Sequence, residues 1–161
     1  MLDIVFFHPE IPPNTGNAMR LAAVTGSRLH LIEPLGFGMD EPRLRRAGLD
    51  YRDKAVVRVH RDLDAWRESV RPRRVFALMV DGERSYDEIE FRDGDAVLFG
   101  PESVGLPSEL LRLDWMTASL RIPMVPGVRS LNLANAAAVV VYEAWRQRGF
   151  EGASHKGRAG S

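Results

Sequence analysis

Short apolar runs alternate with amphipathic stretches along the chain, and this alternation restricts its fold more than any other feature. Residues 2–7, 28–33, 55–60, 74–80 and 95–100 are rich in aliphatic and β-branched residues and are bounded by glycine, proline or charge. Residues 17–26, 41–48 and 62–70 lie between these runs and have the mixed character of helices with one exposed side. Buried strands alternating with helices predict an α/β fold, an open, mostly parallel sheet with helices on both faces.

The composition is that of one globular domain without disulfides. A chain of 161 residues buries a continuous core, and the absence of cysteine excludes disulfides and thiolate metal sites. No apolar run is long enough to cross a bilayer, and the first residues lack the basic leader of an export signal. We therefore expect a cytoplasmic protein without a membrane partner, with one domain over residues 1–150 and a disordered, Gly- and Ser-rich tail over residues 151–161.

Charge is balanced overall but uneven locally. Basic and acidic residues number 22 each, so the chain lacks the net positive charge typical of many nucleic-acid-binding proteins. The basic residues gather in three places: Arg43, Arg45 and Arg46; Arg71, Arg73 and Arg74; and Lys156 and Arg158. Such clusters are either solvated faces or phosphate contacts, and the sequence leaves both interpretations open.

The loops that follow strands are the first places to look for chemistry, because ligands of open α/β sheets bind beyond the carboxyl ends of the strands. The first such loop, "HPEIPPNTGN", begins at His8, where the first apolar run ends. Its adjacent prolines stiffen a turn, and we expect Asn14 or Thr15 to cap the next helix. Asn14, Asn17 and Arg20 recur every three residues and so share one helix face. An ordinary cap followed by exposed side chains is the alternative.

The second loop, "LFGPESVGLP", joins an apolar strand to Gly100, Pro101 and Glu102. Glycine at the end of a strand lets a ligand approach the main chain, and Gly105 permits a tight turn. A glutamate near the start of a helix is also favoured by the helix dipole alone.

The third loop lies within "IPMVPGVRSLNLANAAAVVVYEAW", residues 122–145. Ile122, Pro123 and Met124 are expected to close a strand, and Ser130 is expected to be the N-cap of the apolar helix that follows, with Asn132 beside it.

Several kinds of site do not fit these loops. None of the four histidines lies in the context of a nucleophile elbow, so serine hydrolase chemistry is disfavoured. His8 with Glu10 makes too small a ligand set for a metal, and no metal is expected. The first loop has few glycines and two adjacent prolines, which disfavours a P-loop, a dinucleotide fingerprint and a flavodoxin-like nucleotide-binding domain.

Taken in order, the three loops resemble the signature motifs of the SPOUT class of RNA methyltransferases. The similarity is to the small, single-domain tRNA 2′-O-ribose methyltransferases that act on the wobble nucleotide, and it extends to about Gly149. "PEIPPNTGNAMRLAA" resembles the first motif, "LFGPESVGLP" the second and residues 122–145 the third. The resemblance implies a C-terminal deep trefoil knot, which the alternation of strands and helices alone does not predict.

The resemblance also implies a cofactor and a substrate. S-adenosylmethionine is expected to bind in the knot, leaving S-adenosylhomocysteine as product. The residues implied for its adenosyl group are Leu78, Gly100, Ile122, Met124 and Ser130. The implied substrate is the ribose 2′-hydroxyl of a wobble cytidine or modified uridine, in tRNA of leucine isoacceptors. A catalytically silent member of the fold that only binds RNA or cofactor is the alternative.

Arg20 is the residue that the resemblance implicates in catalysis. Some accounts of the family make this arginine the general base, but a guanidinium stays protonated in proteins. We instead expect Arg20 to hold the adjacent phosphate and stabilise the developing alkoxide, with Glu102 orienting Arg20. Ser130 and Asn132 are expected to position cofactor and ribose.

The helix after the third loop is apolar on more than one side. Its stripe at three- and four-residue spacing consists of Asn135, Ala138, Val139, Tyr142 and Trp145, and much of the remainder is alanine and valine. Such a helix needs cover beyond its own sheet, so we expect a homodimer, in agreement with the resemblance. Asn14, Asn17 and Tyr142 are expected at substrate or dimer contacts, with Arg20 of one chain near the cofactor of the other. A core helix within a monomer is the alternative.

Overall fold

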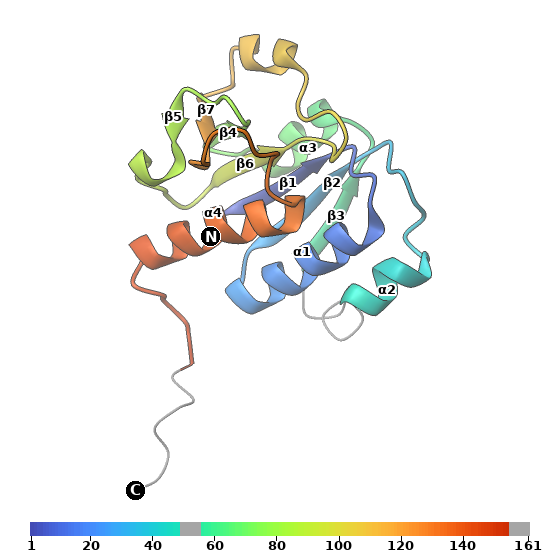
Figure 1. The fold of residues 1–161 in the computed structure, drawn as a ribbon. Coiled ribbons are helices and arrows are strands. Elements are labelled where there is room, and N and C mark those ends of the chain that lie inside the picture. Colours follow the sequence, from blue (N-terminus) through green and yellow to red (C-terminus); the bar gives the residue numbers. More distant parts are fainter. Residues whose placement is uncertain (49–55, 155–161) are drawn as a thin grey trace, which may run out of the picture.

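The computed structural model describes residues 1–48 and 56–154, and a parallel sheet dominates it (Figure 1). Seven strands lie in the order β3-β2-β1-β6-β4-β7-β5, and each neighbouring pair is parallel. The strands are β1 (Asp3–Phe7), β2 (Arg28–Ile32), β3 (Val56–His60), β4 (Arg74–Leu78), β5 (Arg84–Ser85), β6 (Asp95–Phe99) and β7 (Ala118–Arg121). The helices are α1 (Pro12–Thr25), α2 (Pro42–Gly48), α3 (Leu63–Val70) and α4 (Leu133–Gln147), with the 3-10 turns η2 (Tyr86–Glu88) and η3 (Ser108–Arg112). The predicted parallel α/β fold is confirmed.

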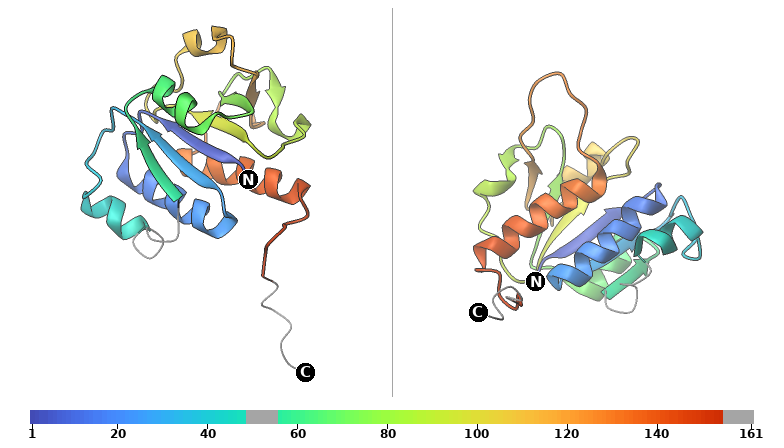
Figure 2. Two further views of the ribbon diagram at one scale, coloured as in Figure 1. Left: turned by 180° about the vertical axis from the view of Figure 1, so that it is seen from behind. Right: turned by 60° about the horizontal axis from the view of Figure 1, so that its bottom comes forward.

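Helices cover both faces of the sheet, as predicted (Figure 2). Side chains alternate along each strand, so Ile4 and Phe6 pack under α1 and α4, while Val5 packs on the opposite face with Trp66 of α3. Leu44 of α2 joins the α1 side. The strands are therefore apolar on both faces, which explains their continuous hydrophobic runs.

Helix α1 begins earlier than the sequence predicts. Its first residue is Pro12, and Ile11 precedes it without a side-chain cap. Proline suits the first turn because its φ is already helical and its missing N–H has no partner there. The prediction that Asn14 or Thr15 caps this helix was wrong, and Asn14 instead lies buried within the first turn.

Helix α4 begins later than predicted. Asn132 is the N-cap, and its side-chain oxygen accepts hydrogen bonds from Ala134 N at 2.9 Å and Asn135 N at 3.3 Å. The prediction that Ser130 is the cap was wrong. Serine and asparagine are both favoured N-caps, and Ser130 and Asn132 stand only two residues apart. The sequence pattern alone therefore does not decide which of the two caps α4.

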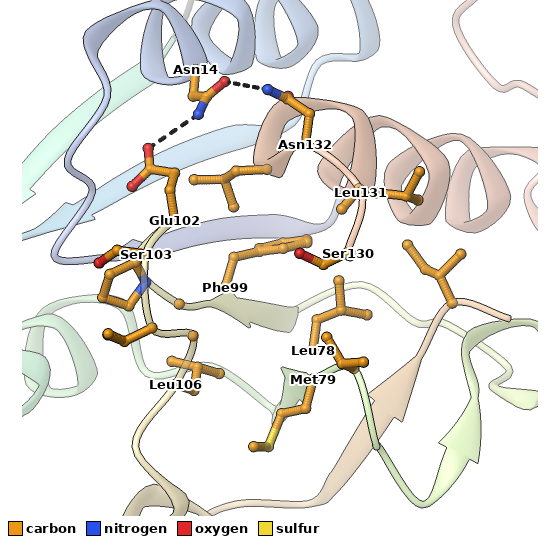
Figure 3. Close-up of a pocket in the computed structure, with 18 of the residues that line it drawn as sticks. Asn14, Leu78, Met79, Phe99, Glu102, Ser103, Leu106, Ser130, Leu131 and Asn132 are labelled. Carbon is orange, nitrogen blue, oxygen red and sulfur yellow. Dashed lines mark hydrogen bonds between the residues drawn. The ribbon is translucent and has the colours of Figure 1, made fainter. Parts of the chain in front are cut away.

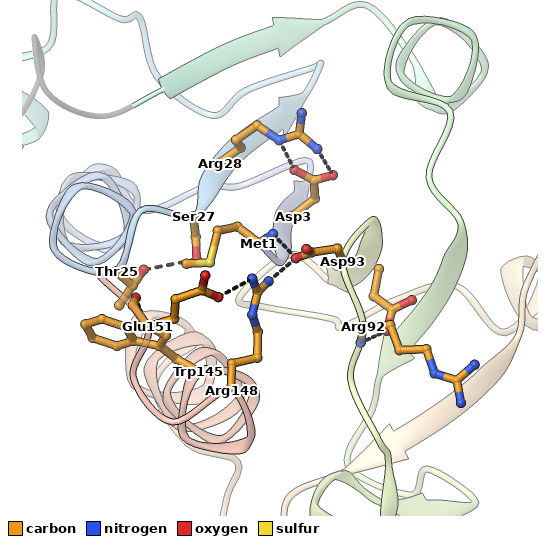
Figure 4. A network of polar contacts seen from close by, with 11 residues as sticks. Met1, Asp3, Thr25, Ser27, Arg28, Arg92, Asp93, Trp145, Arg148 and Glu151 are labelled. Atoms are coloured by element: carbon orange, nitrogen blue, oxygen red, sulfur yellow. Dashed lines mark hydrogen bonds and ion pairs between the residues drawn. The ribbon is translucent and has the colours of Figure 1, made fainter. Parts of the chain in front are cut away.

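The far end of α4 is fixed to the amino-terminal edge of the sheet (Figure 4). Arg148 pairs with Asp93, in the loop before β6, and with Glu151, while the amine of Met1 also pairs with Asp93. Helix α4 therefore runs from the carboxyl edge of the sheet to its amino edge. The last part of the predicted tail, including Lys156 and Arg158, lies outside the described residues, and the trefoil knot stays a prediction.

Candidate active site

A cavity of about 500 Å³ opens beyond the carboxyl ends of β4, β6 and β7 (Figure 3). This volume falls within the range of about 300–1,000 Å³ typical of small-molecule sites. The cavity is lined by the loops that follow β4, β6 and β7 and by the first turns of α1 and α4. All residues expected around the adenosyl group line it, namely Leu78, Gly100, Ile122, Met124 and Ser130.

Its walls are largely apolar. Leu78 ends β4, Phe99 ends β6 with 2% of its surface exposed, and Leu106 closes the turn that follows. Ile122 and Met124 add the third side from the segment after β7. Such walls suit a flat aromatic ring and exclude water from it.

Gly100 is required for a reason that the sequence did not reveal. A Cβ atom at Gly100 would stand 2.3 Å from Gly105 C and from Leu106 N, which no real side chain tolerates. Gly105 has a φ of 70°, and its N–H donates to Pro101 O at 2.9 Å, so the chain folds back on itself. The missing side chain at Gly100 therefore makes room for the protein's own turn, while Gly100 itself also lines the cavity.

Gly82, which the sequence analysis did not single out, has a similar role. A Cβ atom there would stand 2.2 Å from Leu120 C and O, so the loop after β4 presses directly on β7. The Asp81-Gly82 pair that follows an apolar run is the turn signal that indicates this position.

Three polar side chains meet at one edge of the cavity, and they come from the first turn of α1, the loop after β6 and the start of α4 (Figure 3). Asn132 Nδ2 donates to Asn14 Oδ1 at 2.8 Å, and Asn14 Nδ2 donates to Glu102 Oε1 at 3.2 Å. Glu102 also accepts from Glu10 N at 2.8 Å and Ile11 N at 3.0 Å, where the dipole of α1 favours its charge. We call Asn14, Glu102 and Asn132 the loop clamp.

The polar groups of the loop clamp bind one another and the two helix starts. Glu102 accepts hydrogen bonds from the Asn14 side chain and from the two main-chain N–H groups that precede α1, and its expected pairing with Arg20 stays a prediction. A second tie runs beside the clamp, since Ser103 Oγ donates to Glu10 Oε1 at 2.6 Å. The clamp therefore joins the start of α1, the loop after β6 and the start of α4.

Three expected site residues lie away from the residues that line this cavity. Asn17 and Arg20 are exposed farther along α1, and six residues of helix place Arg20 about 9 Å beyond Asn14 along the axis. Tyr142 lies on α4 with 42% of its surface exposed and stacks edge-to-face on Trp145.

Exposed apolar side chains near the mouth of the cavity were not anticipated. Val80 is 61% exposed and Val104 is 81% exposed, and both come from loops that form the walls. Hydropathy alone places valine in a core, so only the folded arrangement reveals this rim.

Two arrangements are not found in the described residues. No three metal-binding side chains converge within residues 1–48 and 56–154. No helix in the same part of the chain combines the length and hydrophobicity needed to cross a bilayer.

Known proteins similar to this chain are RNA methyltransferases. The family model described as the SpoU rRNA methylase family matches residues 1–142. The tRNA (cytidine(34)-2′-O)-methyltransferase of Escherichia coli strain K12 is 54% identical over 153 residues, which cover 95% of this chain and 98% of that relative.

Solved structures agree with this match. One, described as giving structural insights into the 2-OH methylation of C/U34 on tRNA, has a TM-score of 0.86 and 50% identity, and the match covers 94% of this chain and 98% of that one. The SpoU methyltransferase AviRb from Streptomyces viridochromogenes, solved with the cofactor AdoMet, has a TM-score of 0.82 and 26% identity over 93% of this chain and 61% of that one. The parallel sheet, the cavity built by three strand-end loops and the match over residues 1–142 together identify the chain as a member of the SpoU methylase family.

Proposed function

We propose that this protein transfers a methyl group from S-adenosylmethionine to the ribose 2′-hydroxyl of nucleotide 34 of tRNA, a cytidine or uridine, in the cytoplasm. The observation that carries the proposal is the cavity of about 500 Å³, whose apolar walls end at the loop clamp. The names of the similar proteins supply the substrate, and the AviRb complex supplies the cofactor.

The cavity fits the cofactor in size and in chemistry. S-adenosylmethionine supplies a methyl group on a sulfonium cation, which becomes a neutral thioether on transfer. Leu78, Ile122 and Met124 offer apolar surface to the adenine ring, and the main chain of the same loops offers hydrogen bonds to its edge. Exclusion of water destabilises the charged sulfonium more than the neutral product and so favours transfer.

The acceptor hydroxyl needs stabilisation of negative charge. As the new oxygen–carbon bond forms and the sulfur–carbon bond breaks, the hydroxyl proton passes to phosphate or water. Arg20 holds the neighbouring phosphate and stabilises the developing charge on the oxygen. Ser130, which is exposed at the cavity, would contact cofactor or ribose, and Glu102 and Asn132 would act by holding the loops.

A homodimer is part of the proposal. The face of α4 with Ala136, Ala137, Val140 and Val141 is buried against this chain's own core, while the opposite stripe, with Tyr142, is only partly covered. A second copy packed on that stripe would bring Arg20 of one chain to the cavity of the other, which accounts for its absence from the lining of its own chain's cavity.

Mapping of ribose methylation tests the function. The protein is incubated with unmodified tRNA, including leucine isoacceptors, and labelled cofactor, and nuclease fragments are analysed by mass spectrometry. A 2′-O-methyl group at nucleotide 34, absent with Arg20→Ala, is the expected result. A methyl group on a base, or at another nucleotide, overturns the proposal. Binding of S-adenosylhomocysteine without any transfer identifies the silent alternative.

Mixed dimers test the shared site. Arg20→Ala chains and Ser130→Ala chains, each inactive alone, are unfolded and refolded together. If a site combines Arg20 of one chain with Ser130 of the other, random pairing restores about one quarter of the wild-type activity, because half of the dimers carry one intact site of two. No recovery, or a single-chain mass by light scattering at micromolar concentration, contradicts the dimeric arrangement.

A further inference from the structure

Helix α2 carries the first arginine cluster, whose role the proposed function leaves open. The helix has seven residues, of which three are Arg43, Arg45 and Arg46, and none is acidic. The chain as a whole is neutral, so this helix is a local concentration of positive charge. It lies beside α1, on the face of the sheet that also carries α4 (Figure 1).

This cluster is held rigidly. Leu44 is 2% exposed, and a Cβ atom at Gly16 of α1 would stand 2.4 Å from Ala47 Cβ and 2.9 Å from Leu44 O, so α2 packs closely on α1 at this glycine. Leu44 and Ala47 face α1, which turns Arg45 and Arg46 outward, and both are exposed.

The loop that leads into α2 is fixed to the cavity. Gly36 N donates to Pro9 O at 2.9 Å, and a Cβ atom at Gly36 would stand 2.9 Å from Glu10 Cα. Glu10 adjoins Ile11, which lines the cavity. The loop before α2 thus contacts the segment that leads into the cavity, and α2 itself packs on α1, whose first turn lines the cavity.

The arginines of this helix differ in their contacts. Arg43 pairs with Glu41, whose carboxylate also accepts from the N–H groups of Arg43 and Leu44 at the start of the helix. Within residues 1–48 and 56–154, no acidic side chain pairs with Arg45 or Arg46. Two guanidinium groups are thus presented to solvent without neutralisation by the described residues.

In the second arginine cluster, Arg71, Arg73 and Arg74, one arginine stabilises the fold. Arg74 is bound to the buried Asp95 by two hydrogen bonds of 2.9 and 2.6 Å and donates to Glu90 O. Arg71 and Arg73 lie exposed just before β4, at the amino edge of the sheet and so opposite the cavity. The two clusters have similar sequences but different positions relative to the site.

We propose that Arg45 and Arg46 of α2 form a backbone-phosphate contact surface for the anticodon arm of the tRNA whose nucleotide 34 lies at the cavity. This inference rests on the proposed function. Arginine suits the role because its planar guanidinium binds phosphate oxygens through paired hydrogen bonds. Such contacts hold the RNA in register without reading its sequence.

The test compares two double variants. In Arg45→Gln/Arg46→Gln the surface loses both charges, and in the matched control Arg71→Gln/Arg73→Gln the same chemistry is changed at the opposite edge. Binding of a tRNA transcript is measured with S-adenosylhomocysteine present, from about 50 to about 200 mM salt, and each lost phosphate contact lowers the slope of log K against log salt by roughly 0.7–0.9.

The α2 variant is expected to raise the Kd for tRNA on the order of tenfold and to lower the slope by about 1.5. Its KM for tRNA rises while kcat at saturating tRNA stays unchanged, and tRNAs with different wobble nucleotides are weakened equally. The control variant binds like the wild type. Both variants keep the melting-temperature shift produced by S-adenosylhomocysteine, which shows that the cavity is intact.

An α2 variant with the slope and Kd of the control overturns the inference. If the double variant does not fold, Arg45→Gln and Arg46→Gln are measured singly, and each must lower the slope by about half as much. A wild-type protein that binds tRNA through α2 but leaves nucleotide 34 unmethylated refutes the proposed function and leaves the surface standing. If nucleotide 34 is methylated and the KM for tRNA is the same for the wild type and for Arg45→Gln/Arg46→Gln, the phosphate-contact surface is refuted and the proposed function stands.

Discussion

Replacement of Asn132 by alanine removes both the N-cap of α4 and a hydrogen bond to α1. The side-chain oxygen caps α4, and the side-chain amide donates to Asn14 at 2.8 Å. Loss of an N-cap typically costs about 1 kcal/mol, and loss of a hydrogen bond costs about 1 kcal/mol net. Together they lower the free energy of unfolding by about 2 kcal/mol, which for a domain of this size lowers the melting temperature by roughly 4–8 °C.

The matched control is Ser130→Ala. Ser130 is exposed two residues before the cap, so its replacement changes the free energy of unfolding by less than about 0.5 kcal/mol. Asn132→Asp separates the two contacts, because aspartate caps the helix as well as asparagine but has no amide to donate to Asn14. Its stability is expected between those of the wild type and Asn132→Ala.

Thermal and urea unfolding, each with and without S-adenosylhomocysteine, measure these differences. Asn132→Ala is expected to lose both stability and ligand-induced stabilisation, whereas Ser130→Ala keeps its stability and loses part of the ligand effect. Equal destabilisation by the two alanine variants would refute the assignment of the cap. A fully stable Asn132→Asp would refute a contribution from its bond to Asn14.

Further changes test the turn, the loop after β4 and a buried histidine pair. Gly100→Ala forces its Cβ into Gly105 and Leu106, so unfolding by urea should show a loss of about 1–3 kcal/mol together with weaker S-adenosylhomocysteine binding. Gly82→Ala meets the backbone of Leu120 in the same way and should give a similar loss, measured by the same urea titration. Burial and the neighbouring His30, whose Nδ1 lies 3.0 Å from His60 Nε2, lower the pKa of His60 in the folded protein. The unfolded chain therefore binds more protons than the folded protein below about pH 6.5. The stability contributed by His60 is present above that pH and lost below it. His60→Gln should therefore reduce the fall in melting temperature between about pH 7 and pH 5.

The sequence was informative where local patterns decide structure. The apolar runs at β1, β2, β3, β4 and β6 were found because strands buried on both faces need no polar alternation. Strand β5 has only two residues, Arg84 and Ser85, which carry no hydrophobic signal. It exists because β7 supplies a neighbouring edge, and that edge is set by tertiary structure.

At the site, the sequence identified the loops better than the role of each residue. The family resemblance implied that five residues lie together at the adenosyl group, and all of them line the cavity: Leu78, Gly100, Ile122, Met124 and Ser130. The contact between Asn14 and Glu102 was missed because this hydrogen bond joins residues 88 positions apart. Only the packed sheet decides which side chains meet across such a separation.

The length of these separations also ties the site to the whole fold. Asn14 and Asn132 are 118 positions apart, and Glu102 bonds to the start of α1 across 91 and 92 positions. Each of these contacts closes a long loop of chain, and the entropy cost of closing it is met only when the intervening strands and helices are folded. The cavity therefore exists only when β1, β6 and the segment before α4 are all in place. A ligand that binds this cavity stabilises the folded state as a whole, so the melting-temperature shift it produces reports whether the segments that line the cavity are assembled.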